Sequence, residues 1–92
     1  MDEVIEFIRR RWRGYDANWL NGNCYWFARI LCERFPYLQL YYQPVIGHFV
    51  AGAHGIFYDW RGINCEETPI LWSDFEQQEP KIARLILRDC RD

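Results

Sequence analysis

The chain has 92 residues, enough for one small domain and too few for a second hydrophobic core. Half of the residues are hydrophobic and 18% are aromatic, which excludes a disordered chain because this composition can bury enough apolar surface to fold. The formal net charge of -2 gives no reason to expect a nucleic acid or an anionic membrane surface as the partner.

The N-terminus and the cysteines predict a cytoplasmic protein with reduced thiols. Acidic residues occur within the first six positions and no apolar run is long enough to span a membrane, so we expect no signal peptide and no transmembrane segment. The four cysteines show no C-x-x-C spacing and no secretory context. Cys24 and Cys32 fall on one predicted helix, roughly 12 Å apart along its axis, which is too far for a disulfide.

Two helices are predicted before residue 36. Residues 2–12 carry apolar side chains at i, i+4 and i+8, with charged residues on the other side, which is typical of an amphipathic helix. Residues 15–23 contain three asparagines and a glycine and read as a loop. The second helix is predicted from Cys24 to Arg34, and Pro36 ends it. It is apolar on most sides, so we expect other elements to surround it.

From residue 38 onward the apolar period changes to two, which indicates strands. Strands are predicted at residues 38–42, 48–51 and 56–60. The turn residues at 52–55 make the strongest hairpin signal in the chain. Residues 61–69 read as irregular.

The C-terminal part predicts a short helix and a last strand. Residues 73–76 have the capping-box form S-x-x-E, so a helix is expected to begin there and to end at Pro80. Residues 82–87 are mostly apolar and are predicted to form a strand buried on both faces. The element order predicts an α+β domain spanning residues 1–92, with the helices packed on one side of an antiparallel sheet.

Three residues in this framework suggest a nucleophilic site. Cys24 begins the second helix, where unpaired backbone N–H groups and the helix dipole favour a thiolate. His48 and Asp59 follow in the two strands of the hairpin. A two-residue turn at Ala53-His54 or at His54-Gly55 places His48 and Asp59 on one face of the sheet, directly opposite or diagonal, whereas a three-residue turn places them on opposite faces.

On one face, the three side chains could work together. Asp59 would accept a hydrogen bond from the imidazole of His48 and fix its orientation. His48 would then deprotonate Cys24 or share an ion pair with it. The plainer interpretations are a small core cysteine, a structural histidine and a carboxylate that caps a turn.

The motifs resemble those of a known group of enzymes. Asn23-Cys24-Tyr25-Trp26-Phe27-Ala28 at a helix start, a strand beginning Gly47-His48-Phe49, and Asp59 on the neighbouring strand are similar to a minimal papain-like thiol hydrolase. That group includes papain-type proteases, transglutaminase-like enzymes and NlpC-type cell-wall peptidases, and small bacterial or phage proteins share the pattern. The resemblance covers residues 18–60. It implies a small papain-like core, with Cys24 as nucleophile, His48 as general base and Asp59 as the residue that orients His48.

The resemblance also implies a group that stabilises the oxyanion. Papain-type enzymes place a glutamine before the cysteine, and Asn18 is the best positional match. The backbone N–H of Cys24 with the side chain of Asn21 or Asn23 is the alternative. The third residue is Asp, as in transglutaminase-like members, and the chain has no room for a second lobe, so peptidase specificity is not carried over.

The sequence therefore predicts a cysteine hydrolase or acyl transferase that acts on an amide or thioester, such as a peptide. No cofactor and no metal is expected, because Cys24, Cys32, His48 and Cys65 fit no zinc-ligand spacing. The alternative is a catalytically inactive binding or assembly module with a protein partner or a homodimer interface. A buried Cys24, or an exposed patch of three tyrosines on an edge strand, would favour it; these are Tyr37, Tyr41 and Tyr42.

Overall fold

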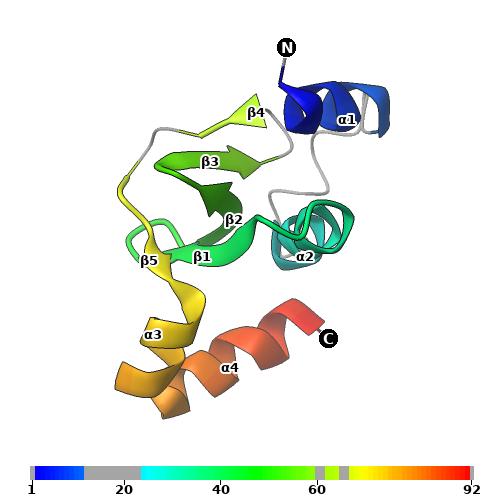
Figure 1. Cartoon of the computed structure of the whole chain (residues 1–92). Helices are drawn as coiled ribbons and strands as arrows, with labels where there is room; N and C mark the ends of the chain where they lie inside the picture. The colour runs from blue at the N-terminus through cyan, green and yellow to red at the C-terminus, as the bar shows by residue number, and fades with distance from the viewer. Residues whose placement is uncertain (1, 12–23, 60–61, 65–66, 92) are drawn as a thin grey trace.

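The computed structural model describes residues 2–11, 24–59, 62–64 and 67–91, which form four helices and one antiparallel sheet (Figure 1). This arrangement confirms the predicted α+β class. The helices are α1 (Glu3–Arg11), α2 (Cys24–Arg34), α3 (Trp72–Gln78) and α4 (Pro80–Arg91). The strands are β1 (Gln39–Gln43), β2 (His48–Ala53), β3 (Ile56–Asp59), β4 (Gly62–Ile63) and β5 (Ile70–Leu71).

The sheet has the strand order β4-β3-β2-β1-β5, and every neighbouring pair is antiparallel. The short strands β4 and β5, which the sequence did not predict, form its two edges. Because the five strands alternate in direction across the sheet, the first and the last, β4 and β5, run in the same direction. The chain between them must therefore cross from one edge of the sheet to the other. This crossover contributes two residues to the polar site described below, Asn64 and Glu67.

The β2–β3 hairpin has a two-residue turn at His54-Gly55. The φ angles of His54 and Gly55 are +55° and +79°, and positive values at both positions are typical of the type I′ turn that matches the twist of a hairpin. The turn pairs Ala51 with Tyr58. His48 and Asp59 therefore project from the same face in diagonal positions, as the prediction with this turn required.

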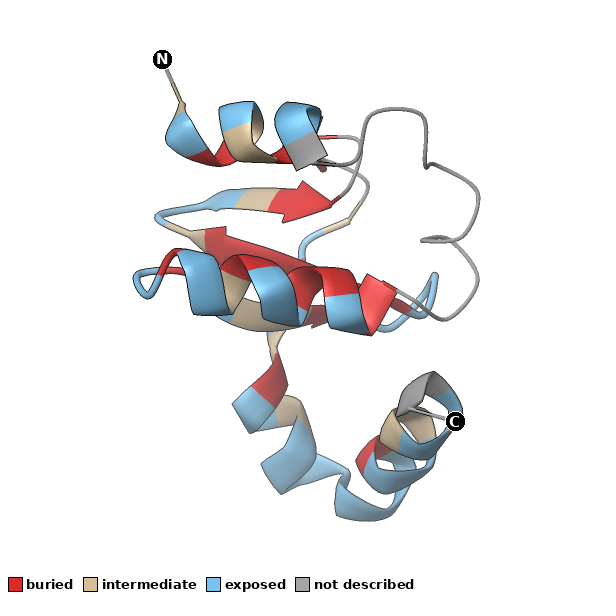
Figure 2. Ribbon diagram, turned by 90° about the vertical axis from the view of Figure 1, so that its right-hand side faces the viewer, coloured by how far each residue is buried: buried red, intermediate tan, exposed pale blue. Residues whose placement is uncertain are grey.

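The two faces of the sheet have different coverings. Helices α1 and α2 lie on one side of the sheet (Figures 1 and 2), and they and Trp72 of α3 contact the face that carries Phe49 and Tyr58. The ring of Tyr25 from α2 lies edge-on to Phe49 at 5.1 Å, and Trp72 from α3 lies 4.8 Å from the same ring. The hydroxyl of Tyr58 donates to the carboxylate of Asp2 before α1. The side chains of Gln43, His48 and Asp59 project from the opposite face.

Helices α1 and α2 have the predicted positions, because capping and apolar spacing agree. The Oδ1 atom of Asp2 accepts a hydrogen bond from the backbone N–H of Val4 at 2.9 Å, which caps α1. On α2, the side chains that face the sheet are fully buried, namely Phe27, Ala28 and Leu31. Trp26 and Ile30 are each 40% exposed. The expectation that other elements surround α2 is therefore wrong, since its outer side meets solvent (Figure 2).

The predicted last strand at residues 82–87 is wrong, because this segment lies inside helix α4. The preceding helix, α3, ends at Gln78, before Pro80 as predicted, and Pro80 is itself the first residue of α4, a position that suits its fixed φ and missing N–H. Ala83 is buried while Ile86 and Leu87 are half-buried, at the i, i+3 and i+4 spacing of a helix face. A short apolar run fits a strand and a helix alike, and the helical spacing decides between them.

The predicted helix after residue 72 forms, but without its predicted cap. Helix α3 begins at Trp72, its N-cap is Leu71, and no side chain hydrogen-bonds to its first N–H groups, so the capping box of Ser73 and Glu76 is absent. Among the described residues, each helix is too short or too polar to cross a lipid bilayer.

Candidate active site

Cys24 is the first residue of α2 and lies at the end of the sheet where β2 begins. Its side chain is buried, with 4% of the residue exposed. Burial alone would raise the pKa of the thiol, but a hydrogen bond with His48 and hydrogen bonds from the backbone N–H groups of Phe49 and Tyr25 outweigh it. The pKa of Cys24 is consequently lower than the ordinary value of 9.0. The structure thus places the predicted nucleophile in contact with the predicted base.

His48 connects Cys24 to Asp59. Its Nε2 atom lies 3.2 Å from Oδ2 of Asp59, and both residues are buried, with exposed fractions of 5% and 1%. Burial alone would lower the pKa of His48, but the hydrogen bonds with Asp59 and Cys24, together with their negative charges, raise it to about 9. A lowered thiol pKa and a raised imidazole pKa favour a thiolate–imidazolium pair at neutral pH.

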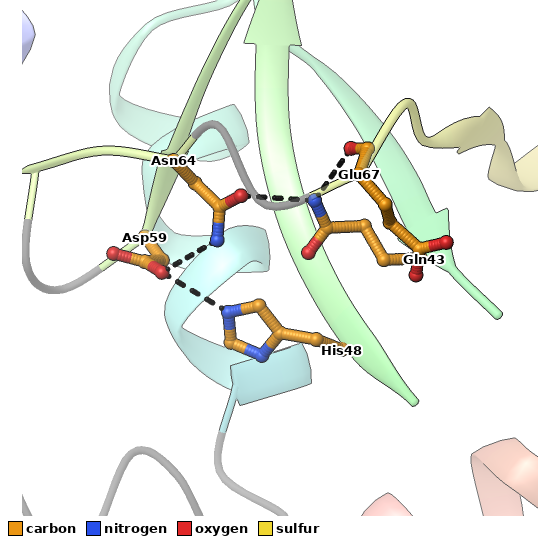
Figure 3. A network of polar contacts seen from close by, with 5 residues as sticks. All are labelled: Gln43, His48, Asp59, Asn64 and Glu67. Atoms are coloured by element: carbon orange, nitrogen blue, oxygen red, sulfur yellow. Dashed lines mark hydrogen bonds and ion pairs between the residues drawn. The ribbon is translucent and has the colours of Figure 1, made fainter. Parts of the chain in front are cut away.

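The two ring nitrogens of His48 have different partners. Nε2 faces Asp59 (Figure 3), so Nδ1 is the nitrogen that remains for the thiol of Cys24. An ionised carboxylate can only accept, which fixes the N–H on Nε2. A neutral imidazole in this tautomer presents an unprotonated Nδ1 toward the thiol, as a general base requires.

Two buried amide side chains continue this network beyond Asp59. Asn64 follows β4 and donates from Nδ2 to Oδ2 of Asp59 at 2.9 Å. Gln43, the last residue of β1 and the direct cross-strand partner of His48, donates from Nε2 to Oδ1 of Asn64 at 2.9 Å. The same Nε2 donates to the backbone oxygen of Glu67 at 2.9 Å (Figure 3). The network therefore joins β1, β2, β3 and the crossover.

Sequence reasoning missed Gln43, Asn64 and Glu67. Gln43 could have been found, because a polar residue closes the strand that pairs with the strand of His48, and a four-residue turn between them sets the two opposite each other. Asn64 and Glu67 gave no such signal, since they lie in a segment without periodicity whose path depends on the crossover.

The predicted oxyanion residues Asn18, Asn21 and Asn23 lie outside the described residues. The backbone N–H of Cys24 belongs to the first turn of α2, where N–H groups have no partner within the helix. The described part of the chain therefore supplies this N–H as the candidate donor to an oxyanion.

The cysteines were predicted to be reduced and to bind no metal. Cys24 and Cys32 are free thiols. Among the described residues no group of three or more His, Cys, Asp or Glu side chains is arranged to hold a metal ion. Cys65, the fourth residue in the set whose spacing fits no zinc site, lies outside the described residues.

The three tyrosines that would have favoured a binding module do not form an exposed patch on an edge strand. Strand β1 is internal, with β2 on one side and β5 on the other. Tyr42 is buried against Phe49 and Trp72 in the core. Tyr41 is half-buried and packs against Phe57, and Tyr37 donates a hydrogen bond to Glu3 at 2.8 Å.

Comparison with known proteins corrects the family. The model of the Phage YunG-like protein family matches residues 4–82, a range that includes Cys24, His48 and Asp59. No curated protein and no solved structure matches the chain. The resemblance to papain-like thiol hydrolases is therefore wrong as a statement of family, since a short motif suggested it and the match over most of the chain is to a phage-like family. The chain belongs to the Phage YunG-like protein family.

Proposed function

We propose that Cys24, His48 and Asp59 form a catalytic triad that cleaves or transfers an acyl group from an amide or thioester. The observation that carries the proposal is the contact between the thiol of Cys24, at the start of α2, and an imidazole that is itself hydrogen-bonded to a buried carboxylate. This is the arrangement of nucleophile, base and orienting group that covalent acyl transfer requires.

The reaction would proceed through an acyl-enzyme. The thiolate of Cys24 attacks the carbonyl carbon, the C–S bond forms, and the carbonyl electrons move to oxygen, where the backbone N–H of Cys24 would stabilise the charge. The intermediate collapses and expels the amine or thiol, which takes the proton from the imidazolium of His48. Water or an acceptor amine then attacks the thioester carbonyl and gives its proton to His48. The C–S bond breaks, the acyl group leaves on the water or amine, and Cys24 is regenerated as a thiolate.

A labelling experiment with p-nitrophenyl acetate tests this proposal without knowledge of the natural substrate. At pH 7 we expect peptide mass spectrometry to find the acetyl group on Cys24 and not on Cys32, and we expect the acetyl group to be lost on incubation in water or with an added amine. In Cys24→Ser, acetylation of the peptide that contains residue 24 should fall to background. Acetylation that is absent, or equal at Cys24 and Cys32, would remove the proposal.

A second function has one observation in its favour. The 4% exposure of Cys24 is what a non-catalytic binding or assembly module would show, because such a module does not need to admit a substrate to the thiol. The same labelling experiment separates the two functions. A folded protein whose Cys24 reacts with neither p-nitrophenyl acetate nor iodoacetamide supports the module.

A further inference from the structure

One backbone oxygen determines which side-chain atoms donate and which accept in the hydrogen bonds that link Gln43, Asn64 and Asp59. The backbone oxygen of Glu67 can only accept, so the carboxamide of Gln43 must present its Nε2 there. The same nitrogen then supplies the N–H that Asn64 receives at Oδ1. Asn64 is consequently oriented with Nδ2, a donor, toward Oδ2 of Asp59. The orientation of Gln43 therefore determines that of Asn64, and the orientation of Asn64 determines which atom faces Asp59 (Figure 3).

This direction matters for the chemistry of Asp59. If Asn64 were turned over, its carbonyl oxygen would face Asp59, and a protonated Asp59 could donate to it. Gln43 opposes that orientation because its N–H would then meet the Asn64 amide nitrogen instead of an oxygen. Asp59 therefore receives N–H donors from both Asn64 and His48, which favours its ionised form.

The same orientation determines what the other polar atom of the Gln43 side chain, Oε1, can contact. Its residue is fully buried, and Oε1 has no hydrogen-bond partner within the described part of the chain. A buried acceptor without a partner destabilises a fold, whereas a methionine of similar length could fill the space without that penalty. What a methionine could not supply is the pair of hydrogen bonds that Gln43 donates, and these account for a glutamine at this position.

We propose that Gln43 and Asn64 are positioning residues that hold Asp59 as an ionised acceptor for His48. The inference rests on the proposed function, because it concerns the same Cys24–His48–Asp59 site. Neither amide would touch the substrate. Their effect would reach Cys24 through Asp59 and His48, so it should appear in the pH dependence of the thiol and not only in the stability of the fold.

Three variants test this role. Gln43→Met and Asn64→Leu keep the approximate size of each side chain and remove its hydrogen bonds. Gln39→Met is the matched control, because Gln39 lies on the same face of the same strand but is exposed. The rate of iodoacetamide labelling at Cys24 is measured from pH 4 to 10 by mass spectrometry, with Cys32 as the reference thiol in each sample.

We expect the pH midpoint of Cys24 labelling to rise in Gln43→Met and in Asn64→Leu. A rise of half a pH unit lowers labelling on the acid side about threefold. The midpoint should stay unchanged in Gln39→Met. Urea unfolding of each variant checks that the protein is folded. If Gln43→Met does not fold, the midpoint in Asn64→Leu decides the matter, because either variant alone breaks the chain of donors.

A second measurement separates this inference from the proposed function. The chain has two histidines, so NMR of a sample labelled with nitrogen-15 in the imidazole rings gives separate signals for His48 and for exposed His54. The signals of His54 serve as the internal reference. As the pH falls, we expect His48 to lose its hydrogen-bonded Nε2–H signal at a higher pH in both variants than in the wild type. This holds even if Cys24 proves unreactive, which would overturn only the proposed function. Unchanged midpoints and unchanged His48 signals in both folded variants would overturn the role of the two amides.

Discussion

Helix α2 carries two thiols whose pKa values are shifted in opposite directions from the ordinary value. Cys24 at its first residue has a pKa below the ordinary 9.0, whereas burial raises the pKa of Cys32, two turns later, to about 11. Both residues lie mainly inside the protein, so loss of hydration acts on both in the same direction. The difference between them must come from the groups that each thiol contacts.

The contacts explain the difference. Cys24 has a buried imidazole, the backbone N–H of Tyr25 at the helix start and the backbone N–H of Phe49 in β2 as partners, and each of these stabilises a thiolate. The charged groups near Cys32 are Arg29 and Glu33, which have opposite signs and are exposed. Position on the helix and one buried partner therefore decide the reactivity of a thiol in α2, whereas burial alone acts against it.

Replacing His48 should remove most of the difference between the two thiols. In His48→Ala the thiol of Cys24 keeps its burial and its backbone N–H partners but loses the imidazole, so its pKa should rise toward the ordinary 9.0. A thiol of that pKa is about 1% ionised at pH 7, so iodoacetamide labelling of Cys24 should fall by up to about 100-fold. Labelling is measured by mass spectrometry, with Cys32 in the same sample as the control.

The result at Cys32 is as informative as the result at Cys24. We expect Cys32 to label at the same slow rate in the wild type and in His48→Ala, because His48 is not among the groups that affect it. Wild-type Cys24 that labels no faster than Cys32 at pH 7 would show that its thiolate either does not form or is closed to the reagent. The contrast between the two ends of α2 would then have no chemical consequence.

The pH dependence of stability offers a second, smaller contrast. The raised pKa of His48 adds stability that is present below the unfolded value of 6.5 and is lost as the pH rises through about 9. The lowered pKa of Cys24 adds stability that is present above 9.0 and is lost as the pH falls through the folded value. Below pH 9 and above the folded pKa of Cys24, the two slopes oppose each other, because a folded thiolate–imidazolium pair binds as many protons as an unfolded thiol and a neutral imidazole.

Removing the thiol should expose the slope of the histidine. In Cys24→Ala, Asp59 still raises the pKa of His48, so the free energy of unfolding should decrease above pH 6.5, by at most about 1.4 kcal/mol per pH unit. Urea unfolding at pH 6, 7, 8 and 9 measures this. Cys32→Ala should be as flat as the wild type, since a pKa of about 11 lies above this range. Parallel profiles for Cys24→Ala and the wild type would argue against an ionised pair.

The sequence predicted the parts of the site that local patterns determine. The bounds of α2 followed from its apolar spacing and from Pro36. A two-residue hairpin turn, as predicted in one of the two registers, places His48 and Asp59 on one face of the sheet. Local patterns were therefore sufficient to name the three residues of the proposed triad. Their order and geometry did not identify the family, because the same constellation recurs in unrelated proteins.

Other features depend on contacts between distant segments and were not predictable. Glu67 reaches Gln43 because the chain crosses the sheet between β4 and β5, and neither short strand has a recognisable pattern. Residues 82–87 of α4 are predicted as a strand because a run of six mostly apolar residues satisfies both periods. Here the burial of Ala83, Ile86 and Leu87 against the core, at helical spacing, shows which period the fold uses.

The smallest expected effect tests whether exposed charges contribute to the contrast at all. Glu33 raises the pKa of Cys32, but it is 79% exposed and its pair with Arg29 is long, at 3.8 Å. Glu33→Gln should therefore increase labelling of Cys32 at pH 8 by no more than about threefold, and 1 M salt should abolish the increase, because salt screens exposed charges. Cys24 should not respond to either change, since its partners are buried. A larger gain that 1 M salt abolishes would mean that surface charge controls the reactivity of Cys32 more strongly than its burial does, whereas a salt-resistant gain would mean that Glu33 acts on Cys32 through something other than its charge.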